Sequence, residues 1–131
     1  MSGAGAVIDP PGFEGYVSDW RMSPGRWAGD TLYLTGMTGH AAGTAGDPPD
    51  PRQQAERAFA RVAAVLDAAG LGWADVVEMT TYHVDIAETL PAFREVRAGV
   101  VVAPFPAWTA IGVAALATPG VVHEIRVVAR R

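Results

Sequence analysis

Between Asp50 and Gly70, apolar side chains recur at intervals of three and four residues, which predicts an amphipathic helix with one buried stripe. The stripe consists of Ala55, Ala58, Phe59, Val62, Val65, Leu66 and Ala69. Asp50 is suited to cap the helix, Pro51 to occupy its first position, and Gln53 to complete a capping box. Gly70 follows the stripe, where helices commonly end in a left-handed residue.

β-Branched and aromatic residues predict four strands, at residues 31–35, 76–84, 107–113 and 121–129. A second helix is expected from about Glu88 to Val100, with Pro91 in its first turn. Residues 36–50 are expected to form a long loop, and residues 1–19 an extended, turn-rich segment with strand-like pieces. With one strand-like piece of the N-terminal segment counted as a strand, the order β-β-α-β-α-β-β predicts a single α+β domain over residues 1–131, with two helices packed on one face of a single β-sheet.

The last two strands indicate what covers the other face of this sheet. Because side chains alternate between faces along a strand, we place Trp108 on the face that also carries Glu124, Arg126, Val122 and Val128. The two helices cover only the opposite face, and this set is too apolar to remain in contact with water. The mixture is typical of a surface buried against another subunit, with an ionisable pocket at the contact.

Composition narrows the classes of function. Half of the 131 residues are hydrophobic and the formal net charge is −4, which argues against a nucleic-acid-binding face. The absence of cysteine excludes a disulfide, a thiolate nucleophile and a cysteine-ligated metal. The N-terminus lacks the basic region of a secretory signal, and no apolar run approaches the roughly 20 residues that span a bilayer. We therefore expect a soluble, cytoplasmic protein without a membrane partner.

The three histidines, His40, His83 and His123, have neither metal-ligand spacing nor a carboxylate pattern that links them. His83 alternates with Met79 and Thr81, which is typical of a packed strand residue. We expect neither a metal nor a cofactor.

Four segments of the chain resemble, in order and spacing, the motifs of one protein family. Residues 23–36, SPGRWAGDTLYLTG, are similar to its pattern SP-x-x-x-x-G-D-x-(L/I)-(F/Y)-x-(S/T)-G, and residues 75–85, DVVEMTTYHVD, to its D-V-V-K-x-T-x-(F/Y)…D strand. Phe105-Pro106-Ala107 and Val122-His123-Glu124-Ile125 are similar to its P-P-A-R-(S/T) and V-E-I-E segments. The match covers about residues 20–130 and identifies the chain as a member of the Rid (reactive intermediate deaminase, or YjgF) family.

The resemblance implies a Rid/chorismate-mutase-like fold and a homotrimer, whose mixed sheets form a central barrel with an active site in each cleft between subunits. Family members that hydrolyse 2-imino acids or enamines use an arginine on the fifth strand to bind the substrate carboxylate. A glutamate on the last strand positions water. Carried over, the resemblance places Glu124 at the glutamate and Thr35-Gly36 at a backbone turn of the site, whereas Trp108 occupies the arginine position.

Other positions also depart from the family pattern. Ala110 stands where many members have cysteine, and Arg94 where asparagine is common. Met22 is near a frequent tyrosine, and it either lines the cleft or packs in the core. Tryptophan offers a ring face and one N–H donor in place of a bidentate guanidinium, so ordinary amino-acid imines are expected to bind poorly. The candidate substrate-binding set is Trp108, Thr35, Gly36, Arg94, Ala107, Thr109, Ala110 and Met22.

Each candidate has a structural alternative. Glu124 either acts as a general acid, a general base or a water-positioning group, or it forms an ion pair with Arg126. Trp108 is either a stacking wall for the substrate or a plug that fills the site. Arg94 either supplies an anion contact, or is solvated or paired with a neighbour such as Glu95 or Asp85. Thr35-Gly36 either offers a hydroxyl and a backbone N–H to the substrate, or contains glycine only for its backbone angle.

Two classes of function remain open. The first is a Rid-type enzyme whose small-molecule substrate is a nonstandard imine, enamine or related reactive intermediate. It would act by hydrolytic deamination, or by tautomerisation or cyclisation. The second is a non-catalytic trimeric module that binds a small metabolite or a partner protein.

Overall fold

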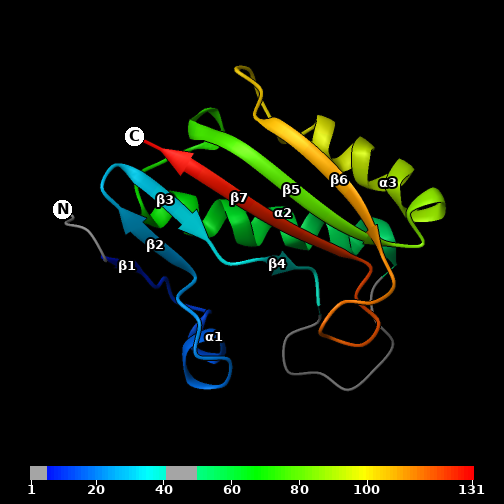
Figure 1. Ribbon diagram of the computed structural model, residues 1–131, viewed down its shortest axis with the longest axis horizontal. Helices are drawn as coiled ribbons and strands as arrows, with labels where there is room; N and C mark the ends of the chain where they lie inside the picture. The colour runs from blue at the N-terminus through cyan, green and yellow to red at the C-terminus, as the bar shows by residue number, and fades with distance from the viewer. Residues whose placement is uncertain (1–5, 41–49) are drawn as a thin grey trace.

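The computed structural model of the protein describes residues 6–40 and 50–131 (Figure 1). Its elements are β1 (Val7–Ile8), α1 (Glu14–Ser18), β2 (Gly25–Ala28), β3 (Thr31–Leu34), β4 (Met37–Thr38), α2 (Pro51–Ala68), β5 (Val76–Val84), α3 (Ile86–Ala98), β6 (Ala107–Val113) and β7 (His123–Arg130). A short 3-10 turn, Trp73–Asp75, precedes β5. In this part of the chain, no helix has the length and apolar character needed to cross a membrane.

The strands of the described residues form one mixed sheet in the order β1-β2-β3-β7-β5-β6, with β4 also paired to β7. β5 and β6 run parallel, whereas the other paired strands are antiparallel. β7 therefore lies inside the sheet, and β6 is one of its two edge strands (Figure 1).

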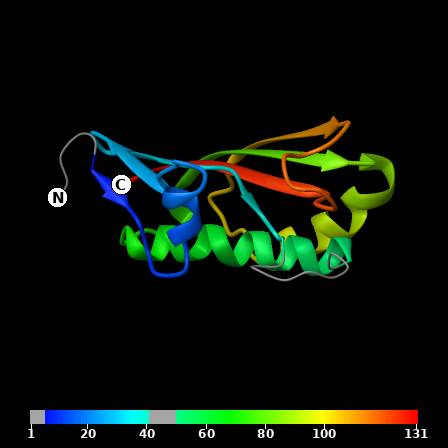
Figure 2. The ribbon, with the colours of Figure 1, turned by 90° about the horizontal axis from the view of Figure 1, so that it is seen from below.

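Both long helices lie on the same face of the sheet (Figure 2). α2 packs against β4 and β7, and α3 packs against β5 and β6. Burial of apolar side chains between the two layers stabilises the fold, at roughly 1.5–3 kcal/mol for each large side chain that is fully buried. These side chains include Leu32, Met37, Phe59, Val62, Leu66, Met79, Phe93 and Ile125.

The start of α2 forms as the sequence predicts and also anchors the turn before β7. A carboxylate oxygen of Asp50 accepts a hydrogen bond from the N–H of Gln53 at 2.9 Å, which satisfies one free donor of the first turn. The buried Gln54 amide accepts from the N–H of Val122 at 2.9 Å and donates to the carbonyl of Gly120 at 3.0 Å. These two bonds tie the end of the preceding loop to the helix.

The predicted strands at residues 31–35, 76–84 and 107–113 are confirmed as β3, β5 and β6. α3 begins two residues earlier than expected, and β7 begins at His123. The extended N-terminal segment and the long loop were predicted wrongly where they contain α1 and β4, respectively. α1 buries none of its five residues and β4 has two residues, so neither produces a detectable apolar period. Residues 1–5 and 41–49 of these segments lie outside the described residues.

The prediction that Trp108 and Glu124 share the uncovered face is wrong. β6 and β7 are not neighbours, because β5 lies between them and sets their relative phase. Trp108 is in register with Met79 of β5, which in turn is in register with Val127 of β7, and the last two are buried under the helices. The indole of Trp108 therefore lies on the helix-covered face, whereas Ile111 lies on the uncovered face with Glu124.

The uncovered face combines exposed apolar groups with charges. Tyr33 and Ile111 are 45% and 39% exposed, and half-buried Val128 lies beside Tyr33 in register. Arg126 and Glu78 form an ion pair there, with a nitrogen–oxygen distance of 3.7 Å. Since a single chain leaves these apolar groups in water, the face has the character of a contact surface.

Candidate active site

A cleft of about 610 Å³ lies where α1 and the segment after it approach β4 and β7. Its lining includes Tyr16, Trp20, Met22, Thr35, Gly36, Thr38, His40 and Glu124. Four residues of the sequence-predicted site, Met22, Thr35, Gly36 and Glu124, are therefore brought together.

Glu124 is the acidic group on the β7 wall of the cleft. It is half-buried on β7, in register with Thr38 on one side and Tyr82 on the other. Burial raises the pKa of its carboxyl group. The ion pair with Arg126 is not formed, because Arg126 lies beside Glu78 instead. Glu124 thus has the environment of a group that exchanges protons closer to neutral pH than an exposed glutamate does.

Tyr16 adds a second titratable group to this cleft. Burial raises the pKa of its phenol; the positive charge of Arg61 lowers it, and the negative charge of Glu124 raises it further. Tyr16 is therefore close enough to Arg61 and Glu124 for their charges to shift its pKa. The sequence pattern does not mark Tyr16, because α1 has no apolar periodicity that would place its side chains.

Arg61 holds the β4 side of the cleft in place. Its guanidinium donates to the carbonyl oxygens of Thr38 at 2.5 Å and of His40 at 2.7 Å. It also lies 3.2 Å from Nδ1 of His40, which is 2.7 Å from the hydroxyl of Thr38. Burial and the charge of Arg61 lower the pKa of His40, so this imidazole is neutral at neutral pH.

Thr35 and Met22 contact each other in the cleft. The Thr35 hydroxyl donates to the sulfur of Met22 at 3.4 Å, and its backbone N–H donates to the carbonyl of Pro24 at 3.0 Å. The Thr35 N–H is thus occupied, whereas its hydroxyl proton lies on a weak acceptor that a ligand oxygen or nitrogen can replace.

The remaining candidates lie elsewhere in the chain, on β6 and α3. Trp108 neither plugs nor lines the Glu124 cleft of its own chain. Its ring supports the guanidinium of Arg97, whose central carbon lies 3.9 Å from the ring centroid. Ala107, Thr109 and Ala110 are exposed along the sheet edge, and Arg94 is exposed on α3.

A buried polar network fixes the indole of Trp108. Its N–H donates to the hydroxyl of Thr81 at 2.9 Å, and this hydroxyl lies 2.7 Å from Nε2 of His83. Nδ1 of His83 lies 2.9 Å from Nδ1 of His123, and both imidazoles are fully buried. The prediction that His83 is a packed strand residue is confirmed.

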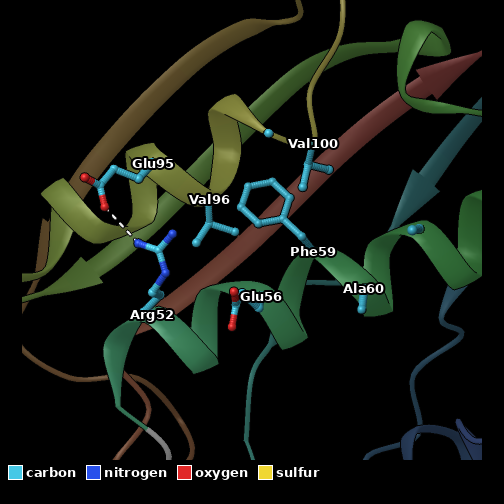
Figure 3. Close-up of a pocket in the computed structure, with 9 residues that line it drawn as sticks. Arg52, Glu56, Phe59, Ala60, Glu95, Val96 and Val100 are labelled. Carbon is cyan, nitrogen blue, oxygen red and sulfur yellow. Dashed lines mark hydrogen bonds and ion pairs between the residues drawn. The ribbon is translucent and has the colours of Figure 1, made fainter.

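A second cavity, of about 440 Å³, lies between the two helices on the side away from the sheet (Figure 3). Phe59, Val96 and Val100 line it, and Arg52 and Glu95 form an ion pair of 2.8 Å across it. It contains none of the residues predicted for the site.

Two helices across one face of a mixed sheet, with a half-buried glutamate in a cleft beside it, define a two-layer α+β protein with a candidate small-molecule site. The family model described as Endoribonuclease L-PSP matches residues 17–131. The chain belongs to this family, the Rid or YjgF family, as its sequence motifs predict.

Two similar proteins cover most of the chain. The RutC family protein YjgH of Escherichia coli (strain K12) is 35% identical over 126 residues, which cover 95% of this chain and 93% of that protein. A 2-iminobutanoate/2-iminopropanoate deaminase of Dermatophagoides farinae is 34% identical over 89 residues, 67% of this chain and 69% of that protein.

Among solved structures, protein YJGH superposes with a TM-score of 0.85 at 31% identity, covering 97% of this chain and 96% of its own. A YjgF-family member from Mycobacterium tuberculosis superposes with a TM-score of 0.80 at 27% identity, covering 96% and 98%. Both have the fold described above.

Proposed function

We propose that the protein is a Rid-type enzyme that acts on a nonstandard imine, enamine or related reactive intermediate, with Glu124 as the acid–base or water-positioning group. The observation that carries this proposal is a half-buried carboxylate with a raised pKa and no ion-pair partner among the described residues, in a cleft large enough for a small molecule. The similarity to an imine deaminase supports the same class of reaction.

For hydrolytic deamination, the ionised Glu124 takes a proton from water as the oxygen bonds to the C=N carbon. The electron pair of the C=N bond moves to nitrogen, which takes up a proton from the protonated Glu124. Glu124 then accepts the proton of the new hydroxyl group and donates a proton to the nitrogen, so that the C–N bond breaks, ammonia leaves and the C=O bond of the product forms. A tautomerisation or cyclisation uses the same proton transfers without addition of water, and the Thr35 hydroxyl lies in the cleft where it could bind the polar end of the substrate.

We further propose that three copies associate through the uncovered face of the sheet, so that the clefts lie at contacts between subunits. The exposed Tyr33 and Ile111 support this arrangement, because apolar side chains on an otherwise uncovered sheet gain stability when a second chain buries them. The net charge of −4 gives no support to a nucleic-acid partner.

The alternative is a non-catalytic trimer that binds a small metabolite or a partner protein. The observation that favours it is Trp108, which stands where the family pattern has the carboxylate-binding arginine and whose N–H is already bonded to Thr81.

The test is turnover by Glu124→Gln beside the wild type. Imines are generated in the assay by an amino-acid oxidase or an amine oxidase, and the release of ammonia is followed. Loss of about 10²- to 10⁴-fold in kcat/KM in this variant supports the enzyme. Glu88→Gln, an exposed glutamate on α3, is the matched control. Absence of turnover in the wild type, with ligand binding retained, contradicts the enzyme and supports the binding module.

A further inference from the structure

Arg97 is held in one orientation by two contacts. The central carbon of its guanidinium lies over the Trp108 ring, 3.9 Å from the centroid, and its Nε donates to the sulfur of Met79 at 3.4 Å. The cation–π contact with Trp108 occupies one face of the guanidinium, and the sulfur of Met79 occupies its Nε–H donor. The outer edge, with the two terminal nitrogens, is left with donors in the fork geometry that matches an oxyanion.

Trp108 is itself a rigid support. Its N–H is occupied by Thr81, whose hydroxyl is part of the buried histidine network. The ring of Phe93 lies 6.4 Å away, centroid to centroid, on the helix side. The indole therefore offers no free donor to a ligand, and its ring face is in contact with Arg97.

The charge of Arg97 has no counter-ion in the described part of the chain. Neither Arg97 nor its neighbour Arg94 forms an ion pair with a carboxylate of those residues. Glu95, between them in sequence, pairs with Arg52 at 2.8 Å. Burial and the positive charge of Arg94 lower the pKa of Arg97, so an anion placed between the two arginines would relieve their repulsion.

A second arginine–indole pair in the same chain shows the contrast. The guanidinium of Arg131 lies 4.2 Å from the ring centroid of Trp27, and its Nε is 3.3 Å from a carboxylate oxygen of Asp30. That pair is neutralised within the chain. The Arg97 pair has the same stacking without a carboxylate.

We propose that Arg97, supported by Trp108 and assisted by Arg94, is a binding site for a planar or tetrahedral oxyanion, a carboxylate or a phosphate, carried by the substrate. The inference rests on the proposed function, and it reverses the expectation that the missing strand arginine favours an uncharged substrate. The anion contact comes from α3 in place of β6.

Within one chain, this anion site and Glu124 lie on opposite faces of the sheet. A single substrate reaches both only if the β6 edge of one copy lies against the Glu124 cleft of the next. β6 is suited to this contact, because it is the outer strand and exposes Ala107, Thr109 and Ala110. The partner copy thus completes the site.

The experiment compares a carboxylate-bearing imine, made by an amino-acid oxidase, with an uncharged imine of the same side chain, made by an amine oxidase. The measured quantity is the ratio of the two kcat/KM values. Arg97→Gln is expected to lower this ratio about 10- to 100-fold, the loss of one charged hydrogen bond, and Arg97→Lys to restore part of it. Arg131→Gln, which removes the neutralised arginine–indole pair, leaves the ratio unchanged. An unchanged ratio in Arg97→Gln overturns the inference.

A binding measurement separates this inference from the proposed function. Pyruvate and inorganic phosphate are titrated separately into the wild type and into Arg97→Gln, and the indole N–H resonance of Trp108 is followed by NMR. A shift with either anion in the wild type that is lost in the variant supports the site, and the tighter anion identifies the ligand class. No shift with either anion overturns it. Turnover lost in Glu124→Gln decides the proposed function independently of either result.

Discussion

The carboxylate of Glu124 packs directly against the backbone of Gly36. A Cβ atom built on Gly36 would lie 2.7 Å from Cδ of Glu124 and closer still to one carboxylate oxygen. The backbone of Gly36 is outside the left-handed region, so its conformation does not require glycine. A side chain at this position would instead occupy the space of the Glu124 carboxylate.

Gly36→Ala is therefore expected to displace the Glu124 carboxylate. We expect kcat/KM to fall by about 100-fold, as for a displacement of roughly 1 Å at a reacting group, and the free energy of unfolding to change little, because the displaced atoms belong to a flexible side chain. Steady-state kinetics and urea denaturation measure the two effects. Gly72→Ala is the matched control, because no atom lies within 4 Å of a Cβ at Gly72 and its φ is −133°. Wild-type activity in Gly36→Ala would contradict the assignment of Glu124.

The raised pKa of Glu124 makes its effect on stability depend on pH. Below its ordinary pKa of 4.5, Glu124 is protonated in both the folded and the unfolded chain, so its burial does not oppose folding. As the pH rises through the higher pKa of the folded state, the buried carboxyl group ionises at a cost, and the free energy of unfolding falls. Glu124→Gln is thus expected to have a higher Tm than the wild type at pH 8, and the two Tm values are expected to converge towards pH 4. Glu88→Gln, measured over the same range, serves as the comparison. A Tm difference that does not change with pH would contradict the burial of the charge.

The sequence was sufficient where the chain repeats a regular period or a family motif. The stripe of α2, the strands β5 and β6, and the cluster of Met22, Thr35, Gly36 and Glu124 were all predicted. The alternation of side chains along a strand shows which residues of that strand share a face. It does not show which residues of another strand lie on the same face of the sheet. The relative phase of β6 and β7 depends on β5 between them, which is why Trp108 was placed on the wrong face.

Tyr16 and Arg97 show a second reason for the limits of sequence. Tyr16 enters the cleft from a helix of five residues that buries none of them, so no pattern marks it. Arg97 is absent from the predicted site residues, because nothing in the order of residues reveals which helix arginine stacks on an indole. Both depend on contacts between segments far apart in the chain.

Thr81 is expected to contribute to stability through two bonds that no neighbour replaces. Thr81→Val keeps the shape of the side chain but leaves the indole N–H of Trp108 and Nε2 of His83 without their partner. The expected cost is about 1–3 kcal/mol in the free energy of unfolding, measured by urea denaturation. Thr80→Val, the neighbouring threonine on the opposite face of β5, is expected to cost less than about 0.5 kcal/mol. Equal effects of the two substitutions would show that the network adds nothing.

The hydrogen bonds of the buried histidine pair run in one direction, which follows from the ring nitrogen that carries the proton in each imidazole. Among the described residues, Nε2 of His123 has no hydrogen bond of good geometry, but the backbone of Pro51 favours its protonation, and proline can offer only its carbonyl. With the proton of His123 on Nε2, its Nδ1 accepts from His83, and Nε2 of His83 accepts from the Thr81 hydroxyl. Both imidazoles are therefore neutral in the folded protein.

Stability is expected to fall as the pH drops from 6.5 towards 4. Burial lowers the pKa of His83 and of His123 from 6.5 to about 4, so in this window the unfolded chain binds protons that the folded chain does not. Each histidine contributes a slope of up to about 1.4 kcal/mol per pH unit. Urea denaturation from pH 8 to pH 4.5 measures the slope, best in Glu124→Gln, because Glu124 contributes with the opposite sign. His123→Gln, combined with Glu124→Gln, should reduce the slope of the free energy of unfolding against pH. If NMR signals of the two imidazoles titrate near pH 6.5, the pair is not buried and neutral.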